Sequence, residues 1–258
     1  MEVYDYNAIY AYSPWQDDKC RFFTKLMYFI TINNIDLSEI REEWLQSEEI
    51  NRQNEHGWTA LMIAVRNYLS GNNKAIVKLL LKHGADVNLR DKKGYSALLW
   101  SYFFNNGHNF ELVELLIKHG ANVNFQQFNG FSILMIMAEY SCQDNNLRVI
   151  KLLLEHGADV HLQGCFRKRT ALKIALEREC GEKTVELLLK YGANIYIINI
   201  KDVHKSMKKY VKQQHQQLIK NLGLKYKAAL IYNRTHNTLP PLEIIPEEVY
   251  KILKFTKR

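Results

Sequence analysis

Histidine and cysteine are the side chains best suited to acid–base, nucleophilic or metal chemistry, and this chain has nine of the first and four of the second. His83, His119 and His156 each stand directly before a glycine that ends an apolar run, where an imidazole helps to close a helix. The cysteines show no C-x-x-C pairing and no recognisable nucleophile context. The sequence also lacks H-E-x-x-H, zinc spacing and a glycine-rich phosphate loop. These patterns predict a binding protein with no enzymatic activity, no metal and no cofactor.

Aromatic residues that follow a glycine are the better candidates for function. They occur in N-E-H-G-W, D-K-K-G-Y and Q-F-N-G-F, and aromatic side chains are favoured anchors at protein interfaces. The predicted client-binding residues are Trp58, Tyr95, Phe131, Asn54, Asp91 and Lys93. The alternative, weighted equally, is that the aromatics pack between neighbouring turns as spacers. If they bind a client, replacing Trp58 and Tyr95 together by Ala weakens binding and leaves folding intact.

Four pentads indicate the elements that position these residues. They are G-A-D-V-N at 84–88, G-A-N-V-N at 120–124, G-A-D-V-H at 157–161 and G-A-N-I-Y at 192–196. Their period is about 36 residues, and each follows a segment with apolar residues three and four apart, which is typical of an amphipathic helix. Thr59 and Thr170 precede apolar runs, where a hydroxyl can cap a helix. Each unit is therefore turn, helix, turn, helix, and the units must stack to bury their helix faces.

This pattern resembles the ankyrin repeat, which reads D-x-x-G-x-T-P-L-H-x-A and ends in L-L-x-x-G-A-D-V-N. The resemblance rests on residues 54–65, 91–102, 127–138 and 166–176. It implies an all-α solenoid of stacked helix-turn-helix units with helical caps, whose turn tips and inner helices bind partner proteins. The Pro and His of T-P-L-H are absent in every unit, so we expect repeats that are less rigid than consensus ones.

The expected organisation has five parts. They are an N-terminal arm at 1–16, a degenerate N-terminal capping repeat at 17–50, four ankyrin repeats at 51–200, a C-terminal capping helix at 201–222 and a helical tail at 223–258. Within the N-terminal cap, residues 17–33 and 37–46 each predict one helix. The apolar positions of the capping helix are expected to pack on the last repeat; they are Met207, Tyr210, Val211, Leu218 and Ile219.

Positive charge is concentrated beyond the repeats. Residues 201–258 hold 13 Lys and Arg against 4 Asp and Glu, whereas residues 1–200 hold 22 against 23. Charge of this kind attracts nucleic acid or an anionic membrane, and that binding is one alternative function. The lysines are spread over helix faces without an aromatic stacking pattern, so the sequence favours solvation over nucleic-acid binding.

The sequence also predicts a compartment and an assembly state. No run of 18 apolar residues and no basic leader is present, so we expect neither membrane spanning nor secretion. Unpaired cysteines indicate a reducing compartment, and we expect a cytoplasmic monomer. Abundant Asn, Ile, Lys and Tyr are typical of AT-rich genomes, including large DNA viruses and intracellular bacteria. In that case the client is a host protein, met in the host cytoplasm or nucleus.

Residues 223–255 resemble the SOCS box found in many ankyrin-repeat proteins. Leu224, Ala228 and Tyr232 lie four apart on one helical face, as in the helix that inserts into elongin C of elongin B/C. A second element, which favours a cullin, is loosely matched by Leu239, Pro240 and Pro241. The sequence departs from the box in three ways. Ala228 replaces the usual Cys, Tyr232 replaces an aliphatic residue, and the terminal helices are short.

The same stretch also resembles the start of an F-box, L-P-x-E-I-x-x-x-I-L, which closes many poxviral ankyrin proteins and binds Skp1. Pro246, Glu247, Val249, Ile252 and Leu253 are the residues that match it. Either resemblance implies an adaptor that couples a client to a cullin-type ubiquitin ligase. A third interpretation is that residues 223–258 only cap the solenoid.

Overall fold

The computed structural model describes residues 24–31, 37–68, 73–103, 110–140, 144–165, 168–178, 181–195 and 203–213. The chain divides into two compact units, residues 1–128 and 129–258. Helices are the regular elements of the described residues, which contain no β-strand, although Arg90 and Ser96 form a single β-bridge. The predicted all-α class is therefore confirmed for the residues that the structure describes.

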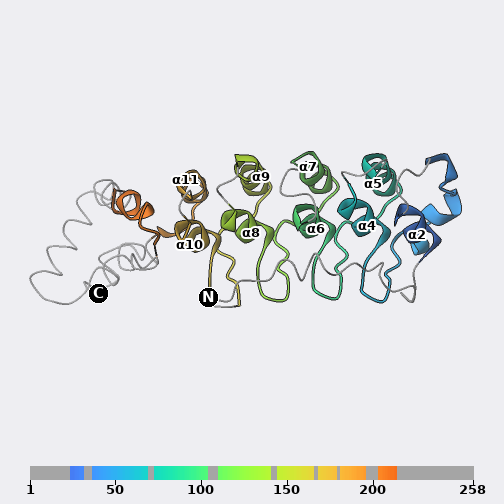
Figure 1. Cartoon of the computed structure of the whole chain (residues 1–258), viewed down its shortest axis with the longest axis horizontal. Coiled ribbons are helices and arrows are strands. Elements are labelled where there is room, and N and C mark those ends of the chain that lie inside the picture. Colours follow the sequence, from blue (N-terminus) through green and yellow to red (C-terminus); the bar gives the residue numbers. More distant parts are fainter. Residues whose placement is uncertain are drawn as a thin grey trace, which may run out of the picture. The chain divides into compact units, whose positions relative to one another are not determined.

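Two helical hairpins make up most of the first unit. Helix α4 (Ala60–Arg66) pairs with α5 (Asn73–Lys82), and α6 (Ala97–Phe103) pairs with α7 (Phe110–Lys118). Helices α4 and α6 pack on each other and form one row, here called the inner helices (Figure 1). Helices α5 and α7 form the second row, here called the outer helices (Figure 1). The connections that lead into α6 extend beyond the inner row, away from α5 and α7 (Figure 1).

The second unit repeats this arrangement. Helix α8 (Ile133–Glu139) pairs with α9 (Asp144–Glu155), α10 (Ala171–Leu176) pairs with α11 (Glu182–Lys190), and α8 packs on α10 (Figure 1). Residues 207–213 are helical, with Met207 and Val211 buried. The backbone N–H of His204 donates to the Leu176 carbonyl at 2.8 Å, which ties this segment to the end of α10.

Side-chain caps begin the inner helices, as the sequence predicts. The Thr59 hydroxyl accepts a hydrogen bond from the Met62 N–H at 3.2 Å, and the Thr170 hydroxyl accepts one from the Lys173 N–H at 3.3 Å. Ser132 caps α8 in the same way. Each cap satisfies one of the N–H groups that the first turn of a helix leaves without a partner.

Glycines end the outer helices in the left-handed conformation. Gly84, Gly120, Gly157 and Gly192 have φ between +79° and +89°. After Gly84 the Ala85 N–H donates to the Leu80 carbonyl at 3.0 Å, which closes the end of α5. The amphipathic stripe is also confirmed, because Ile76, Val77 and Leu80 of α5 are buried while its lysines are exposed.

The N-terminal cap differs from its prediction in detail. Helix α2 (Lys25–Thr31) lies in the first predicted segment and packs on α4. The single helix predicted at 37–46 is wrong, since the chain forms 3-10 turns at Leu37–Glu39 and Glu42–Leu45 and then α3 (Ser47–Ile50). Extended backbone at Arg41 and Gln46 separates these short pieces, so that Leu45 and Ile50 can both face the core.

Candidate partner-binding site

The turns that precede α4 and α6 are each built on one polar side chain. In turn 1 (residues 54–58) the Asn54 Oδ1 accepts hydrogen bonds from the N–H groups of His56 and Trp58, at 3.0 and 2.9 Å. In turn 2 (residues 91–95) the Asp91 Oδ1 accepts from Lys93 and Tyr95, at 2.8 and 2.9 Å. Asn54 and Asp91 are buried, so they hold the turns in shape from inside.

The Asp91 carboxylate has a third partner. The Trp100 Nε1–H of α6 donates to its Oδ2 at 3.0 Å. Burial raises the pKa of Asp91 above the ordinary aspartate value, and the hydrogen bonds from Tyr95, Lys93 and Trp100 oppose that rise. Turn 2 is therefore anchored to the inner helix that follows it.

Hydrogen bonds also join neighbouring turns within the first unit. The Lys92 N–H donates to the His56 carbonyl at 3.0 Å, and the Gln53 Nε2 donates to the carbonyls of Gly57 and Arg90, at 2.6 and 2.8 Å. Arg90 takes the role of Gln53 one repeat later, because its guanidinium donates to the Gly94 carbonyl. In the second unit the Cys165 N–H donates to the Asn129 carbonyl at 3.0 Å, the same bond as between turns 1 and 2.

The aromatics predicted to contact a client are buried. Trp58, Tyr95 and Phe131 expose 2%, 8% and 5% of their surface. Both the Trp58 and the Tyr95 rings lie against the Trp100 ring, with centroids 4.6 and 4.8 Å apart. This is the spacer arrangement that the sequence offers as the alternative. Contact between these rings and a client stays a prediction, and among the predicted residues Lys93 is the exposed one.

A residue that the sequence reasoning missed stands on the same surface. Phe128 in turn 3 (residues 127–131) is 71% exposed. The repeat sequence distinguishes Phe128, because turns 1 and 2 carry the polar residues Glu55 and Lys92 at the corresponding position. The aromatic residue sets this turn apart from turns 1 and 2, and exposed turn residues are candidates for contact with a partner.

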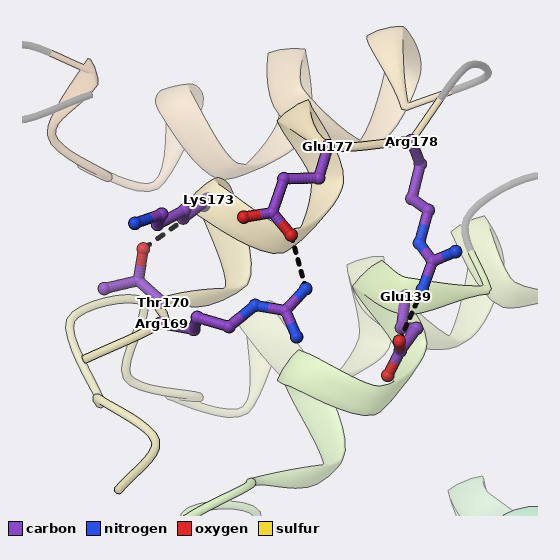
Figure 2. A network of polar contacts seen from close by, with 6 residues as sticks. All are labelled: Glu139, Arg169, Thr170, Lys173, Glu177 and Arg178. Carbon is purple, nitrogen blue, oxygen red and sulfur yellow. Dashed lines mark hydrogen bonds and ion pairs between the residues drawn. The ribbon is translucent and has the colours of Figure 1, made fainter. Parts of the chain in front are cut away.

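The fourth turn is built differently. Lys168 stands where the other turns have glycine and takes a positive φ of 46°. Arg169 stands where they have an aromatic residue. Its guanidinium lies over the Phe131 ring, and its Nη2 is 2.5 Å from the Glu177 Oε2. Figure 2 shows this pair beside a second one between Arg178 and Glu139, which links the end of α10 to the end of α8. Ion pairs thus do here what ring packing does in the first unit.

Comparison with known proteins identifies the repeat. The family model described as "Ankyrin repeats (3 copies)" matches residues 100–199, and the single "Ankyrin repeat" model matches residues 56–92. Together the two matches cover more than half of the chain. The chain belongs to the ankyrin-repeat family. Ankyrin-repeat proteins are generally non-enzymatic scaffolds for protein–protein interaction.

Relatives of this ankyrin chain occur in a giant virus and in mammals. Two ankyrin repeat proteins of Acanthamoeba polyphaga mimivirus are 45% identical over 101 residues and 41% identical over 93 residues. These alignments cover 38% and 34% of this chain but 17% and 15% of the viral proteins. Ankyrin repeat and SAM domain-containing protein 6 of Rattus norvegicus is 43% identical over 75 residues, which are 29% of this chain and 8% of the rat protein. The chain therefore spans less than a fifth of these relatives.

The ankyrin assignment explains the histidines before the helix-ending glycines. Nδ1 of His119 lies 2.9 Å from the Leu115 carbonyl, and Nδ1 of His156 lies 2.9 Å from the Leu152 carbonyl. Both rings therefore close helix ends. Across the described residues no group of three or more His, Cys, Asp and Glu side chains is placed to hold a metal ion. No helix in that part of the chain has the length and apolar character needed to span a membrane.

Other predicted sites fall elsewhere in the chain. The N-terminal arm at 1–16 lies outside the described residues. So do the residues predicted to recruit a ligase, Leu224, Ala228, Tyr232, Leu239, Pro240, Pro241, Ile252 and Leu253.

Proposed function

We propose that this ankyrin chain is an adaptor whose turn tips bind a client protein and whose residues 223–258 recruit a cullin-type ubiquitin ligase. The observation that carries client binding is the set of hydrogen bonds that locks turns 1 and 2 to each other, such as that from Lys92 N–H to the His56 carbonyl. A surface held in shape before binding loses little conformational entropy when a partner docks.

The predicted client-binding residues take two roles in this proposal. Lys93 is exposed and contacts the client directly. Asn54, Asp91 and the three buried aromatics act on the client through the shape of the turns. We therefore expect the double replacement of Trp58 and Tyr95 by Ala to lower both client affinity and thermal stability. A loss of affinity with unchanged melting would instead assign the two rings to the binding surface.

Ligase recruitment is supported by the sequence of the tail. Leu224, Ala228 and Tyr232 have the spacing of a helix that docks in an elongin C groove, whereas Ile252 and Leu253 fit the F-box pattern for Skp1. Affinity purification of the full chain from eukaryotic cells, with residues 223–258 present or deleted, separates the possibilities. Recovery of elongin B/C or of Skp1 that depends on the tail supports the adaptor. Recovery of neither leaves a binding scaffold without ligase recruitment.

That simpler scaffold is the second candidate, and packing at the end of the repeats favours it. Met207 and Val211 are buried, as in a capping helix. Burial and the charges of Glu186 and Glu182 in α11 raise the pKa of Tyr210 in the same segment. Binding of nucleic acid or an anionic membrane by the basic tail is the remaining alternative. A steep loss of RNA or DNA binding with added salt would favour it.

The viral relatives bear on where the chain acts. Because its relatives include mimivirus proteins, we extend the proposal to a host-cell client, met in the host cytoplasm or nucleus. One chain is the binding unit in this proposal, and size-exclusion chromatography with light scattering tests whether it is monomeric.

A further inference from the structure

An exposed aromatic ring lies on turn 2 of the first unit. The Phe128 Cδ1 is 3.4 Å from the position that a Cβ on Gly94 would occupy, and the Arg90 Nη2 is 2.8 Å from that same position. The ring and the guanidinium therefore both lie against one glycine. The missing side chain of Gly94 leaves room for them, and 71% of the Phe128 surface stays in contact with solvent.

The surroundings of this ring are positively charged. Arg90 is held in place, because its Nε donates to the Gly94 carbonyl at 3.1 Å and its Nη2 donates to the Gln126 carbonyl at 2.8 Å. Both acceptors are neutral, and the guanidinium also lies over the Phe125 ring, with its Cζ 5.3 Å from the ring centroid. Arg90 is therefore held by neutral groups. Lys92 and Lys93 are exposed beside it, and within the described residues Lys92 forms no ion pair. The one carboxylate of turn 2, that of Asp91, is buried and accepts a hydrogen bond from Trp100 Nε1–H, and the charge of Lys93 acts on it.

We propose that Arg90, Lys92, Lys93 and Phe128, here called the basic aromatic tip, bind an acidic segment of the client that carries an apolar side chain beside its carboxylates. This inference rests on the proposed function, since it assigns a chemistry to the client. The apolar side chain would remove the Phe128 ring from water, and the carboxylates would meet the three cations. Arg90 is already ordered by two hydrogen bonds, which reduces the entropy lost on binding.

A nucleic acid also combines negative charge with apolar rings, but the tip fits it less well. Proteins that track a single strand stack successive bases on several aromatic side chains. Phe128 is the one exposed aromatic that the described turns carry. A peptide needs a single apolar anchor and a few charges, which matches the tip.

The test is a selection of random dodecamer peptides on the full-length chain. We expect the enriched peptides to be acidic and to contain an aromatic or aliphatic residue. Their affinity should fall about 10-fold or more in Phe128→Ala and in the double variant Lys92→Glu, Lys93→Glu. It should also fall about 10-fold between about 50 mM and about 500 mM salt, because the charges are exposed.

Matched controls separate the tip from general changes in charge or apolar surface. Lys78→Glu with Lys82→Glu makes the same charge change on α5, and Tyr28→Ala removes another exposed ring. Both controls should keep the affinity within about twofold. Enriched peptides that bind the tip variants as well as the native chain would overturn the tip and leave the scaffold function standing. A complete lack of enrichment would count against both.

A separate binding measurement tests the nucleic-acid alternative. A 20-residue oligothymidylate should bind the native chain no better than it binds Phe128→Ala. Tight binding of this probe that is lost in Phe128→Ala would replace the acidic peptide by a single-stranded nucleic acid.

Discussion

Two glycines with the same backbone angle should respond differently to alanine. Gly57 in turn 1 and Gly84 at the end of α5 both have a φ of +81°. A Cβ in this left-handed region is unfavourable by about 1–2 kcal/mol. Alanine also restricts the unfolded chain, which offsets about 0.4–1 kcal/mol of that cost. The conformational term alone therefore lowers the free energy of unfolding by about 1 kcal/mol at either position.

The space around the two glycines is what separates them. A Cβ on Gly84 would meet no heavy atom within 4 Å, whereas a Cβ on Gly57 would lie 2.8 Å from both Asp91 Cα and Lys92 N. These atoms belong to the backbone of turn 2, and the Lys92 N–H is bonded to the His56 carbonyl at 3.0 Å. Ordinary contact begins at 3.4 Å, so turn 2 would have to move by about 0.6 Å. Overpacking of this kind costs about 1–3 kcal/mol.

We therefore expect Gly57→Ala to lower the free energy of unfolding by about 2–4 kcal/mol and Gly84→Ala by about 1 kcal/mol. Urea denaturation of both variants and the native chain, followed by far-UV circular dichroism, measures the difference. Gly94→Ala is an informative third variant, because its closest contact would be the flexible end of Arg90, at 2.8 Å, and its loss should be intermediate.

The outcome that would refute this reasoning is equal destabilisation by Gly57→Ala and Gly84→Ala, within about 0.5 kcal/mol. It would mean that turn 2 yields to the added methyl group at no cost, and that the turns are not locked to one another. A larger loss at Gly84 than at Gly57 would refute it more strongly.

Three further substitutions test single interactions. Asp91→Asn keeps an oxygen for the turn N–H groups but sets an amide N–H₂ against the Trp100 Nε1–H. It should lower the free energy of unfolding by about 1–3 kcal/mol, and by less in a Trp100→Phe background. A double-mutant cycle measures the coupling between the two side chains. Because burial raises the pKa of Asp91, this carboxyl stabilises the fold most below its unfolded pKa and less as the pH rises through the folded pKa. Urea titrations across that acid range should therefore show a steeper fall in stability with pH for the native chain than for Asp91→Asn. Lys168→Gly should raise the free energy of unfolding by about 0.5–1 kcal/mol in the same denaturation assay, since it removes a non-glycine residue from positive φ. Asn88→Ala should lower the melting temperature by several degrees, because the Asn88 side chain bonds two backbone groups of the next pentad at 2.8 and 2.9 Å.

Much of the fold follows from short patterns in the sequence. The period of the pentads predicts the helical hairpins, and Thr59, Thr170 and the helix-ending glycines predict where the helices begin and end. The prediction fails at 37–46, where apolar residues at helical spacing form two 3-10 turns and not one helix. The pattern there does not show that Leu45 and Ile50 have to reach the same core from opposite sides of Gln46.

The candidate site followed less well from the sequence. The aromatics after the turn glycines are recognisable as special, yet Trp58 packs against Trp100, a residue of the next repeat, and Tyr95 packs against the same ring. Phe128 is apolar at a position where turns 1 and 2 have a polar residue. Its exposure and its position against Gly94 are known only from the structure.

Sequence and structure thus inform on different length scales. Helix caps, left-handed glycines and apolar stripes are determined by the backbone and by side chains within one or two helical turns. The local amino-acid sequence is therefore enough to predict them. Whether a turn residue packs or is available to a partner depends on a neighbouring repeat about 36 residues away. For Trp58 that neighbour supplies a ring, and for Gly57 it leaves no space for a methyl group. These two relations arise from stacking, and no single repeat contains them, whereas the hydrogen bond from Trp100 to Asp91 lies within one repeat.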